Sequence, residues 1–508
     1  MQQPSTGRRV KRRVIVVGAG VGGLVAGLEL AAQGLEVVIC DALEQPGGKL
    51  RQVHIGPARL DAGPTVFTMR WVFEELFEQV GETLADHLQL HKAETLARHA
   101  WSADERLDLF ADTQRSASAI GDFAGAAEAR RYLAFCERAR QIYQTLETPF
   151  LRGSRPNPLS LSWRVGAQGL HGLARISPFG SMWGELGRYF HDPRLRQLFG
   201  RYATYCGSSP FMAPATLMLV AHVEQDGVWL LEGGMHALAT TLAAMASRRG
   251  AVFRYSTAVA EILIKGGSAC GVRLANGEVI EAAAVVFNGD VAALSTGLLG
   301  AGATTAVAPA DPAARSLSAI TWNLVAPMAG FELLRHNVFF SPDYRSEFDA
   351  LFGRGELPAD PTVYVCAQDR NDENNTEPHA GSRLLCLVNA PASGDAAHGL
   401  TAAAVERCEA GAFARLSQCG LQIDQNTAEV IRTTPADFER LFPATGGALY
   451  GQASHGWQAS FARPGARSKL DGLYLAGGST HPGPGVPMAA LSGRQAAASV
   501  IADLGRSP

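Results

Sequence analysis

The chain has 508 residues and a formal net charge of −3, with 45 Lys and Arg residues against 48 Asp and Glu residues. Hydrophobic residues make up 47 % of the chain and charged residues 18 %. This length allows roughly two to four domain-sized units with an ample core. Because there is no basic excess, the composition argues against nucleic acid as a partner.

Eight cysteines are scattered through the chain without a C-x-x-C pair or a clustered spacing. That distribution argues against zinc, iron–sulfur clusters and a disulfide framework, so no metal site is expected. We interpret the cysteines as reduced thiols of a cytoplasmic protein, most of them packing residues. They are Cys40, Cys136, Cys206, Cys270, Cys366, Cys386, Cys408 and Cys419.

A basic cluster at residues 8–13, followed by the apolar residues 14–28, resembles a signal peptide or a transmembrane segment. The apolar run has 15 residues, five of them glycine, whereas a spanning helix needs roughly 20. No other segment is long and apolar enough to cross a membrane. The basic cluster either touches anionic lipid or is a solvated entry to the first strand.

The stretch 14–27 predicts a strand, a tight glycine turn and a helix. Val14–Val17 is a β-branched run typical of a buried parallel strand. Gly18, Gly20 and Gly23 follow at the G-x-G-x-x-G spacing, which allows the turn, a backbone approach to a pyrophosphate and close helix–strand packing. The helix start would offer free N–H groups and a positive dipole end to phosphates.

An acidic residue completes this fingerprint. The helix is expected to run to about Gln33 and to stop at Gly34, and Glu36–Cys40 reads as the next strand. Asp41 follows directly, 21 residues after Gly20, where a carboxylate would bind the ribose hydroxyls of a dinucleotide. A glycine turn in another α/β fold is the alternative, and the full pattern favours dinucleotide binding over it.

Three further turns suit the same ligand. Gly47-Gly48-Lys49 and Asp61–Thr65 could each approach the cofactor, although ordinary surface turns remain the alternative. In residues 472–494, a strand meets a glycine- and proline-rich loop and then a helix that ends at about Leu504. Pro487 is placed in the first turn of that helix, where proline is favoured. Its start would be a second positive dipole end.

Periodicity predicts the remaining elements. Apolar residues recur every three or four positions from Arg70 to Leu90, which indicates a helix, and residues 99–112 read as a hairpin. Residues 117–226 are mainly helical and rich in aromatic residues, which modestly favours an apolar ligand over an ordinary helical core. Further strands are expected at 251–255, 257–264, 271–274, 279–281, 282–287, 323–331, 362–367 and 384–388, helices at 238–249 and 401–416, and a linker at 300–315.

Together these pieces resemble the FAD-dependent carotenoid desaturases, relatives of bacterial phytoene desaturase. The shared motifs are VIVVGAGVGGLVAG, PGGK, DAGPTV, EGGMHAL, VVFNGD and LYLAGGSTHPGPGVPMAALSGR, which span residues 14 to 494. The THPGPGVP loop is the most specific of them. GRYATYCGSSPF, HNVFF and YVCAQDR look closest to the 1-hydroxycarotenoid 3,4-desaturases, also known as methoxyneurosporene dehydrogenases.

The resemblance implies an α/β fold in which a Rossmann-like FAD-binding domain of the amine-oxidase type joins an α+β substrate domain and a helical subdomain that could face a membrane. The FAD-binding domain would comprise residues 8–69, 227–298 and 470–508. The substrate domain would comprise 70–116 and 316–469, and the helical subdomain 117–226.

The resemblance also assigns site residues. Asp41 would bind the ribose, and Val259 would bond adenine through its backbone. The family usually has Glu in place of Asp41 and often Arg in place of Lys49, and Lys lacks the bidentate geometry of Arg. Near the pyrophosphate would lie Gly18, Gly20, Val21, Gly22 and Gly23, and near the flavin Gly48, Lys49, Thr65, Gly477, Gly478, Val486, Pro487 and Met488.

The implied reaction is C3–C4 desaturation of an acyclic 1-hydroxy or 1-methoxy carotenoid, with hydride transfer to flavin and loss of a proton. His481 is a candidate proton acceptor of suitable pKa class, and a structural histidine that orders the loop is the alternative. His236 and Asp61 are poorer candidates. A phytoene-type multistep desaturase, an amine oxidase, a redox-neutral carotenoid isomerase and a non-catalytic carotenoid carrier are the rival functions.

The expected partners follow from this reaction. A carotenoid substrate implies peripheral contact with a membrane surface, at the inner or photosynthetic membrane of the cell. Because no second G-x-G-x-x-G is convincing, NAD(P) is disfavoured as electron acceptor. Oxygen, a quinone and another redox protein remain open.

Overall fold

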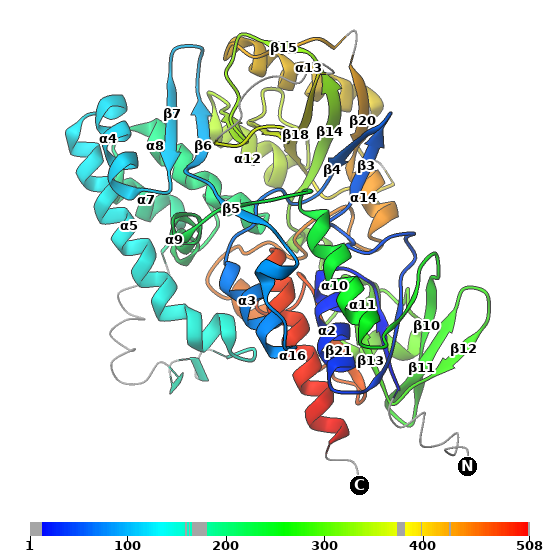
Figure 1. Cartoon of the computed structure of the whole chain (residues 1–508). Coiled ribbons are helices and arrows are strands. Elements are labelled where there is room, and N and C mark those ends of the chain that lie inside the picture. The colour runs from blue at the N-terminus through cyan, green and yellow to red at the C-terminus, as the bar shows by residue number, and fades with distance from the viewer. Residues whose placement is uncertain are drawn as a thin grey trace.

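The computed structural model describes residues 13–157, 160–161, 163–164, 180–372, 381–397, 399–425 and 428–505. One half lies at the bottom of Figure 1, around α2, α16 and β21, and a half built on a larger sheet lies above it. Helices α4, α5, α7, α8 and α9 flank the two halves on the left (Figure 1). The residues 8–12 of the basic cluster lie outside the described residues.

The lower half contains a five-stranded parallel sheet with the strand order β21-β13-β1-β2-β9. Strand β1 is central, and its residues from Val14 to Val16 are fully buried, as the β-branched run predicts. Helix α2 packs against both α10 and α16, and these helices cover this sheet (Figure 1). The elements are β1 (Arg13–Val17), α2 (Val21–Ala32), β2 (Glu36–Cys40), α10 (His236–Arg248), β9 (Val252–Arg254), β13 (Ala284–Phe287), β21 (Leu473–Leu475) and α16 (Val486–Leu504).

A three-stranded antiparallel meander stands beside the parallel sheet (Figure 1, lower right). Its strands are β10 (Val259–Lys265), β11 (Ser268–Leu274) and β12 (Val279–Glu281). The expected Asn276-Gly277 turn connects the last two, and Gly277 has a φ of 88°, which glycine adopts without strain. Short segments follow at α11 (Ala292–Ser295), η5 (Ala301–Ala306) and η6 (Pro312–Ala314).

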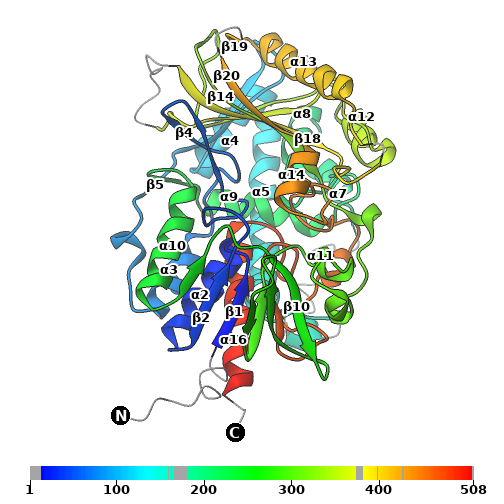
Figure 2. The ribbon, with the colours of Figure 1, turned by 90° about the vertical axis from the view of Figure 1, so that its right-hand side faces the viewer.

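The upper half is organised on a mixed seven-stranded sheet with the order β20-β14-β18-β17-β16-β6-β7. Figure 2 shows helix α13 lying across the top of this sheet. Successive side chains of β14 point to opposite faces of the sheet. Trp322 packs in the core under α13, whereas Thr321 lines the cavity described below. The elements are β6 (Thr95–Ala100), β7 (Arg106–Phe110), β14 (Ser318–Ala326), β16 (His336–Phe339), β17 (Val363–Ala367), β18 (Ser382–Ala390), α13 (Ala402–Gln418) and β20 (Glu429–Thr433).

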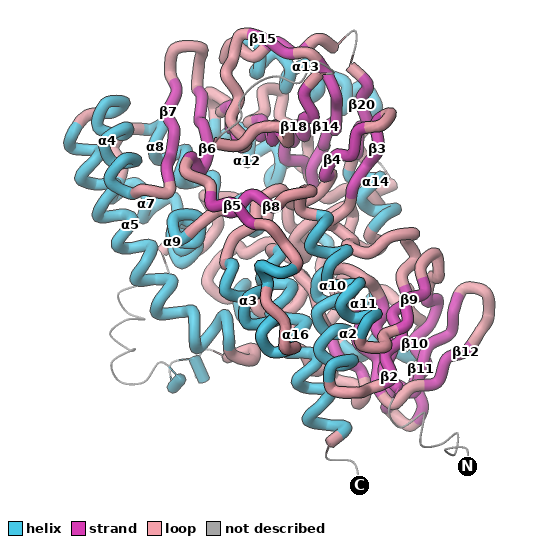
Figure 3. Tube along the Cα trace, viewed as in Figure 1, coloured by secondary structure: helices cyan, strands magenta, loops and turns pink. Residues whose placement is uncertain are grey.

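Helices dominate the described part of 117–226, as expected (Figure 3). These are α4 (Thr113–Ala124), α5 (Ala126–Leu146), η2 (Glu147–Arg152), α7 (Met182–Tyr189), α8 (Pro193–Gly200), η3 (Arg201–Cys206), η4 (Ala215–Met218) and α9 (Leu219–Asp226). The smaller remaining elements are β3 (Gln52–Ile55), β4 (Ala58–Asp61), β8 (Trp229–Leu231), β15 (Met328–Ala329), α12 (Tyr344–Phe348), η7 (Asp349–Arg354), β19 (Gln422–Ile423), α14 (Pro435–Leu441) and α15 (Ala459–Ala462).

Two predicted elements differ from the structure. The helix expected from Arg70 to Leu90 is only α3 (Arg70–Gln79), because Gly81 takes a φ of 76° that ends it. A short turn, η1 (Leu84–Asp86), and β5 (Leu90–Lys92) follow, and β5 pairs with β8. The strand expected at 323–331 instead starts at Ser318 and ends before Pro327, which lacks a backbone donor for the ladder.

The sequence thus predicted the α/β fold class correctly, whereas its domain boundaries stay a prediction. The hairpin β3–β4, placed with the FAD-binding residues by sequence, packs against β14, β18 and β20 of the upper sheet. Among the described residues, no helix combines the length and apolarity that a membrane span requires.

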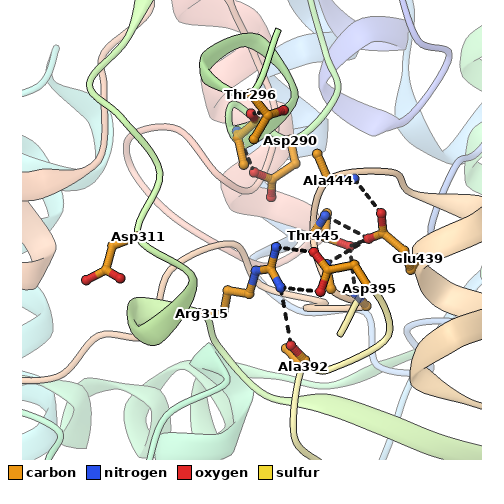
Figure 4. A network of polar contacts seen from close by, with 12 residues as sticks. Asp290, Thr296, Asp311, Arg315, Ala392, Asp395, Glu439, Ala444 and Thr445 are labelled. Atoms are coloured by element: carbon orange, nitrogen blue, oxygen red, sulfur yellow. Dashed lines mark hydrogen bonds and ion pairs between the residues drawn. The ribbon is translucent and has the colours of Figure 1, made fainter. Parts of the chain in front are cut away.

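A polar network holds the loop 444–451 between the halves (Figure 4). Glu439 of α14 accepts hydrogen bonds from the backbone N–H groups of Ala444 and Thr445 at 2.8 and 2.9 Å. Arg315 forms a bidentate ion pair with Asp395 at 2.7 and 2.6 Å. Because the charges are paired and the backbone N–H groups of the loop have acceptors, the loop 444–451 is held in place and forms part of the wall of the cavity described below.

Candidate active site

The glycine turn after β1 is built around the side chain of Asn288, which follows β13. A Cβ on Gly20 would lie 2.9 Å from Asn288 Nδ2, and one on Gly22 would lie 2.6 Å from Oδ1. A Cβ on Gly23 would lie 2.1 Å from the carbonyl oxygen of Gly18. Only glycine fits these positions, so the turn stays narrow and its backbone stays open to a ligand.

The start of α2 fits a diphosphate. Gly20 is its N-cap, and no side chain accepts a hydrogen bond from the first turn, so the N–H groups there are free for an anion. Asp41 lies at the end of β2, buried, and accepts from the N–H of Ala19 at 2.6 Å and of Leu43 at 2.7 Å. Burial raises the pKa of Asp41, and these two hydrogen bonds oppose that shift.

The second turn meets the first. The backbone of Gly47 bridges to that of Gly20, and Gly48 has a φ of 57° with its Cβ position 3.2 Å from the Cα of Gly20. Lys49 follows and donates from Nζ to the carbonyl oxygen of Leu449 at 2.8 Å. Burial lowers the pKa of Lys49. The PGGK motif thereby joins the nucleotide cradle to the loop 444–451.

The C-terminal loop forms the far side of the cradle. Helix α16 begins after Gly485 without a side-chain cap, as α2 does, and Pro487 lies in its first turn as predicted. Gly477 has a φ of 111°. The buried Arg463, which sequence reasoning missed, donates to the carbonyl oxygens of Tyr450 and Gly478, both at 3.1 Å. This arginine therefore fixes the glycine loop against the loop 444–451.

A largely apolar cavity of about 460 Å³ lies between these loops, the upper sheet and the helices α5, η3 and α9. Its volume is within the range of pockets that hold small molecules. Five predicted site residues line it: Lys49, Thr65, Val486, Pro487 and Met488. The other predicted cofactor residues are not among its lining and lie instead in the glycine turns, at the end of β2 and at the start of β10; they are Gly18, Gly20, Val21, Gly22, Gly23, Asp41, Gly48, Val259, Gly477 and Gly478.

His481 does not line the cavity, although its neighbours Pro482 and Gly483 do. Its buried ring donates from Nε2 to the carbonyl oxygen of Gly153 at 3.0 Å and packs edge-on against Phe150 at 4.9 Å. Burial lowers the pKa of His481 to about 4. This geometry favours the structural alternative, in which the histidine ties the loop 477–485 to the end of η2.

Asp61 and His236 also have structural partners. The carboxylate of Asp61 accepts from the N–H of Met235 at 2.6 Å and of His236 at 3.3 Å, at the start of α10. The ring of His236 bonds the carbonyl oxygen of Pro46 at 2.9 Å. The motifs DAGPTV and EGGMHAL are therefore two sides of one contact, which sequence spacing alone did not reveal.

Several polar residues of the cavity wall were not predicted. Tyr364 shares hydrogen bonds of 2.7 Å with Thr65 Oγ1 and with His336 Nδ1. Glu347 accepts from Thr362 Oγ1 at 2.7 Å. Burial raises the pKa of Glu347 to about 7 and lowers that of His336 to about 3. In the sequence, the only signal that could have predicted these residues is an ionisable side chain within an otherwise apolar stretch.

The parallel sheet and the glycine turns are those of a dinucleotide-binding fold. Residues 21–501 match the family described as flavin containing amine oxidoreductase. A solved putrescine oxidase bound to putrescine has a TM-score of 0.57 and 17 % identity, with 97 % of this chain and 99 % of that one covered. At this identity the likeness concerns the fold alone.

Two curated relatives are much closer in sequence. The hydroxyneurosporene desaturase of Rubrivivax gelatinosus is 56 % identical over 493 residues, covering 97 % of this chain and 94 % of that protein. That of Cereibacter sphaeroides is 43 % identical, covering 98 % and 99 %. The chain therefore belongs to the flavin-containing amine oxidoreductases and, within them, to the carotenoid desaturases; it is an oxidoreductase and its cofactor is FAD.

Proposed function

We propose that this protein desaturates the C3–C4 bond of acyclic 1-hydroxy or 1-methoxy carotenoids. One observation carries the proposal: the apolar cavity of about 460 Å³ is lined by the residues expected beside the flavin, Lys49, Thr65 and Met488. A hydrocarbon chain would bury its surface against the apolar part of this lining and would bring no polar groups of its own that need partners. The names of the two relatives supply the substrate class.

Bound FAD would accept a hydride from one of the two carbons. The chain must then hold the C3–C4 bond in place, exclude water and remove a proton from the neighbouring carbon. The cofactor roles assigned to the glycine turns, Asp41, Val259 and the residues 477–488 belong to this proposal. His481 faces away from the cavity. Glu347 and Glu224 line its wall, so they are the carboxylates nearest to a substrate.

The cavity is poorly suited to an amine. Four basic side chains, those of Lys49, Arg51, Arg201 and Arg463, line it, whereas among the described residues only two carboxylates do, those of Glu224 and Glu347. This excess of basic groups disfavours an ammonium group. A phytoene-type multistep desaturase and a redox-neutral isomerase are compatible with the same apolar walls. The experiment below excludes the isomerase by its reaction, and the same assay with phytoene as substrate tests the multistep desaturase.

We also propose that the protein works at the cytoplasmic side of a membrane, as a peripheral protein. Trp457 and Leu161 line the cavity, and Trp163, two residues after Leu161, is 87 % exposed. Large apolar side chains in water beside an apolar cavity favour contact with lipid, where the substrate resides.

The test is anaerobic mixing of the FAD-loaded enzyme with 1-hydroxyneurosporene. Desaturation would bleach the flavin absorbance and shift the carotenoid spectrum to longer wavelength. A flavin that stays oxidised while the carotenoid isomerises or only binds would contradict the proposal. Reoxidation by oxygen, a soluble quinone or a redox protein, compared in rate, then identifies the electron acceptor.

A further inference from the structure

A cluster of polar side chains that contains one arginine faces the cavity beside Thr65. Arg201, Tyr205 and Glu224 line both the main cavity and a small adjoining one of about 10 Å³, which Tyr364 and His336 also line. Tyr202 donates to Glu224 Oε2 at 2.5 Å, and Tyr205 donates to Oε1. The carboxylate is thus held by two tyrosine hydroxyls.

The guanidinium of Arg201 lies 5.3 Å from the ring centroid of Tyr205 and 5.9 Å from that of Tyr202, but these ring contacts leave its N–H groups without good acceptors among the described residues. Within the described part of the chain, its Nη2 reaches only the hydroxyl of Tyr205, at 3.4 Å, and its Nε has no acceptor. No described carboxylate lies within 4.0 Å of it, although Glu224 is close enough to influence its pKa. An arginine has five N–H donors, so most of those of Arg201 await a partner.

Such an arginine is costly in an apolar pocket unless a ligand supplies an acceptor. A pure hydrocarbon carotenoid has none and would seal the unpaired donors away from water. A carotenoid with an oxygen on C1 would bring an acceptor, and a hydroxyl and a methoxy oxygen serve equally well in that role. The cluster therefore distinguishes carotenoids with an oxygen on C1 from carotenoids without one.

We propose that Arg201, positioned by Tyr205 and Glu224, binds the C1 oxygen of the substrate and thereby selects hydroxylated or methoxylated carotenoids. This inference rests on the function proposed above and names the residues that set its substrate class. It treats Arg201 as a substrate-binding residue and Tyr205 and Glu224 as positioning residues.

The position of the cluster fits the bond that reacts. The C1 oxygen is three covalent bonds from C3, a separation of about 3 to 4 Å in an ordinary chain. Thr65, expected beside the flavin, bonds Tyr364, which lines the same small cavity as Arg201. An oxygen held at Arg201 would therefore place C3–C4 near Thr65 rather than further along the cavity.

The test compares 1-hydroxyneurosporene with neurosporene, which lacks the oxygen, for the FAD-loaded wild type and Arg201→Met. For the hydroxylated substrate, we expect kcat/KM to fall about 10- to 100-fold in the variant, as for one charge-assisted hydrogen bond. With neurosporene it should stay unchanged or rise. Arg201→Lys should restore part of the preference.

Binding gives a second readout. Quenching of flavin fluorescence by each carotenoid should show the same loss of preference in Arg201→Met, at unchanged flavin content. Arg188→Met, at an exposed arginine of α7, is the matched control and should leave both substrates unaffected. If Arg201→Met fails to fold, Tyr205→Phe replaces it in the test, because this variant removes the hydroxyl between Arg201 and Glu224. It should reduce the preference for 1-hydroxyneurosporene over neurosporene several-fold.

The outcomes separate the two proposals. A wild type that desaturates neither carotenoid contradicts the proposed function. A wild type that uses both equally well, or an Arg201→Met enzyme that loses both activities in parallel, overturns the role of Arg201 while leaving the desaturase function intact.

Discussion

At the scale of single residues, the site depends on side chains that occupy the space left free by glycines, which have no Cβ. Asn288 occupies the interior of the glycine turn, so Gly20 and Gly22 must lack a Cβ for it to fit. Arg463 likewise joins two loops through three carbonyl oxygens, those of Tyr450, Gln452 and Gly478. Neither residue belongs to the glycine fingerprint, yet Asn288 determines the shape of the fingerprint turn and Arg463 fixes the C-terminal glycine loop.

Gly23→Ala should abolish FAD binding. The added methyl would lie 2.1 Å from the carbonyl oxygen of Gly18, and neither backbone segment can retreat without opening the turn. The flavin absorbance of the purified protein measures the effect. Gly121→Ala, in helix α4 with 3.6 Å of space, is the control and should retain its full flavin. A yellow Gly23→Ala protein would mean that the turn does not hold the cofactor.

Glu347 should make the folded protein less stable as the pH rises. Burial raises the pKa of Glu347 to about 7 from its ordinary value of 4.5, so its stabilising contribution is complete below pH 4.5 and is lost as the pH rises through 7. Glu347→Gln removes this loss. At pH 8.5 the variant should exceed the wild type in unfolding free energy by up to about 3 kcal/mol, and near pH 4.5 the gap should close.

Thermal unfolding of both proteins across this pH range measures the gap. The opposite trend, with Glu347→Gln falling behind the wild type as the pH rises, would show that the carboxylate is ionised in the fold and stabilised by a partner.

At the scale of elements, distant motifs act as pairs. The turn after β4 and the start of α10 are joined by the carboxylate of Asp61, and the turn before Lys49 is joined to α10 by His236. Asp61 also bonds the upper sheet, because its carbonyl oxygen accepts from Asn323 and Gln368, both at 2.9 Å. One residue therefore connects the nucleotide-binding half to the strands β14 and β17.

Asp61→Ala should destabilise the protein by about 2 to 4 kcal/mol, because two buried N–H groups of α10 lose their acceptor. The midpoint of thermal unfolding, with FAD bound, measures the loss. Asp86→Ala, at an exposed aspartate, should change the midpoint little. An equal midpoint for Asp61→Ala and the wild type would show that water replaces the carboxylate.

At the scale of the whole molecule, the cavity exists because two halves meet. The parallel sheet supplies the glycine loops, the seven-stranded sheet supplies a wall of alternating side chains, and the flanking helices supply the apolar remainder. Its polar lining includes Arg201, Tyr364 and Glu347, and also Lys49 and Arg463 beside the glycine loops. The remaining walls suit a long hydrocarbon.

Membrane contact should depend on the exposed tryptophans. The double variant Trp163→Ser, Trp457→Ser removes side chains that are 87 % and 38 % exposed, and its co-sedimentation with lipid vesicles should fall about 10-fold. Val430→Ser, at a valine of β20 that is 46 % exposed, is the control. Unchanged co-sedimentation of the double variant would place the membrane contact elsewhere on the surface.

The sequence by itself determined the nucleotide-binding elements. The strand β2 has the predicted bounds, and α2 and α16 begin where the glycine turns end, because local signals of β-branched runs, glycine and an early proline decide these positions. The helix predicted over 70–90 was too long. The apolar period continues beyond residue 80, but the positive φ of Gly81 ends the helix.

Only the tertiary structure decided which polar residues face the ligand. His481 had the right chemistry for a base but turns toward Gly153, whereas Arg201, Glu224 and Glu347 lie in ordinary helical or aromatic stretches and meet at the cavity. Sequence patterns report local periodicity and turn chemistry. The direction of a side chain into a shared cavity depends on long-range packing between segments, which no spacing along the chain encodes.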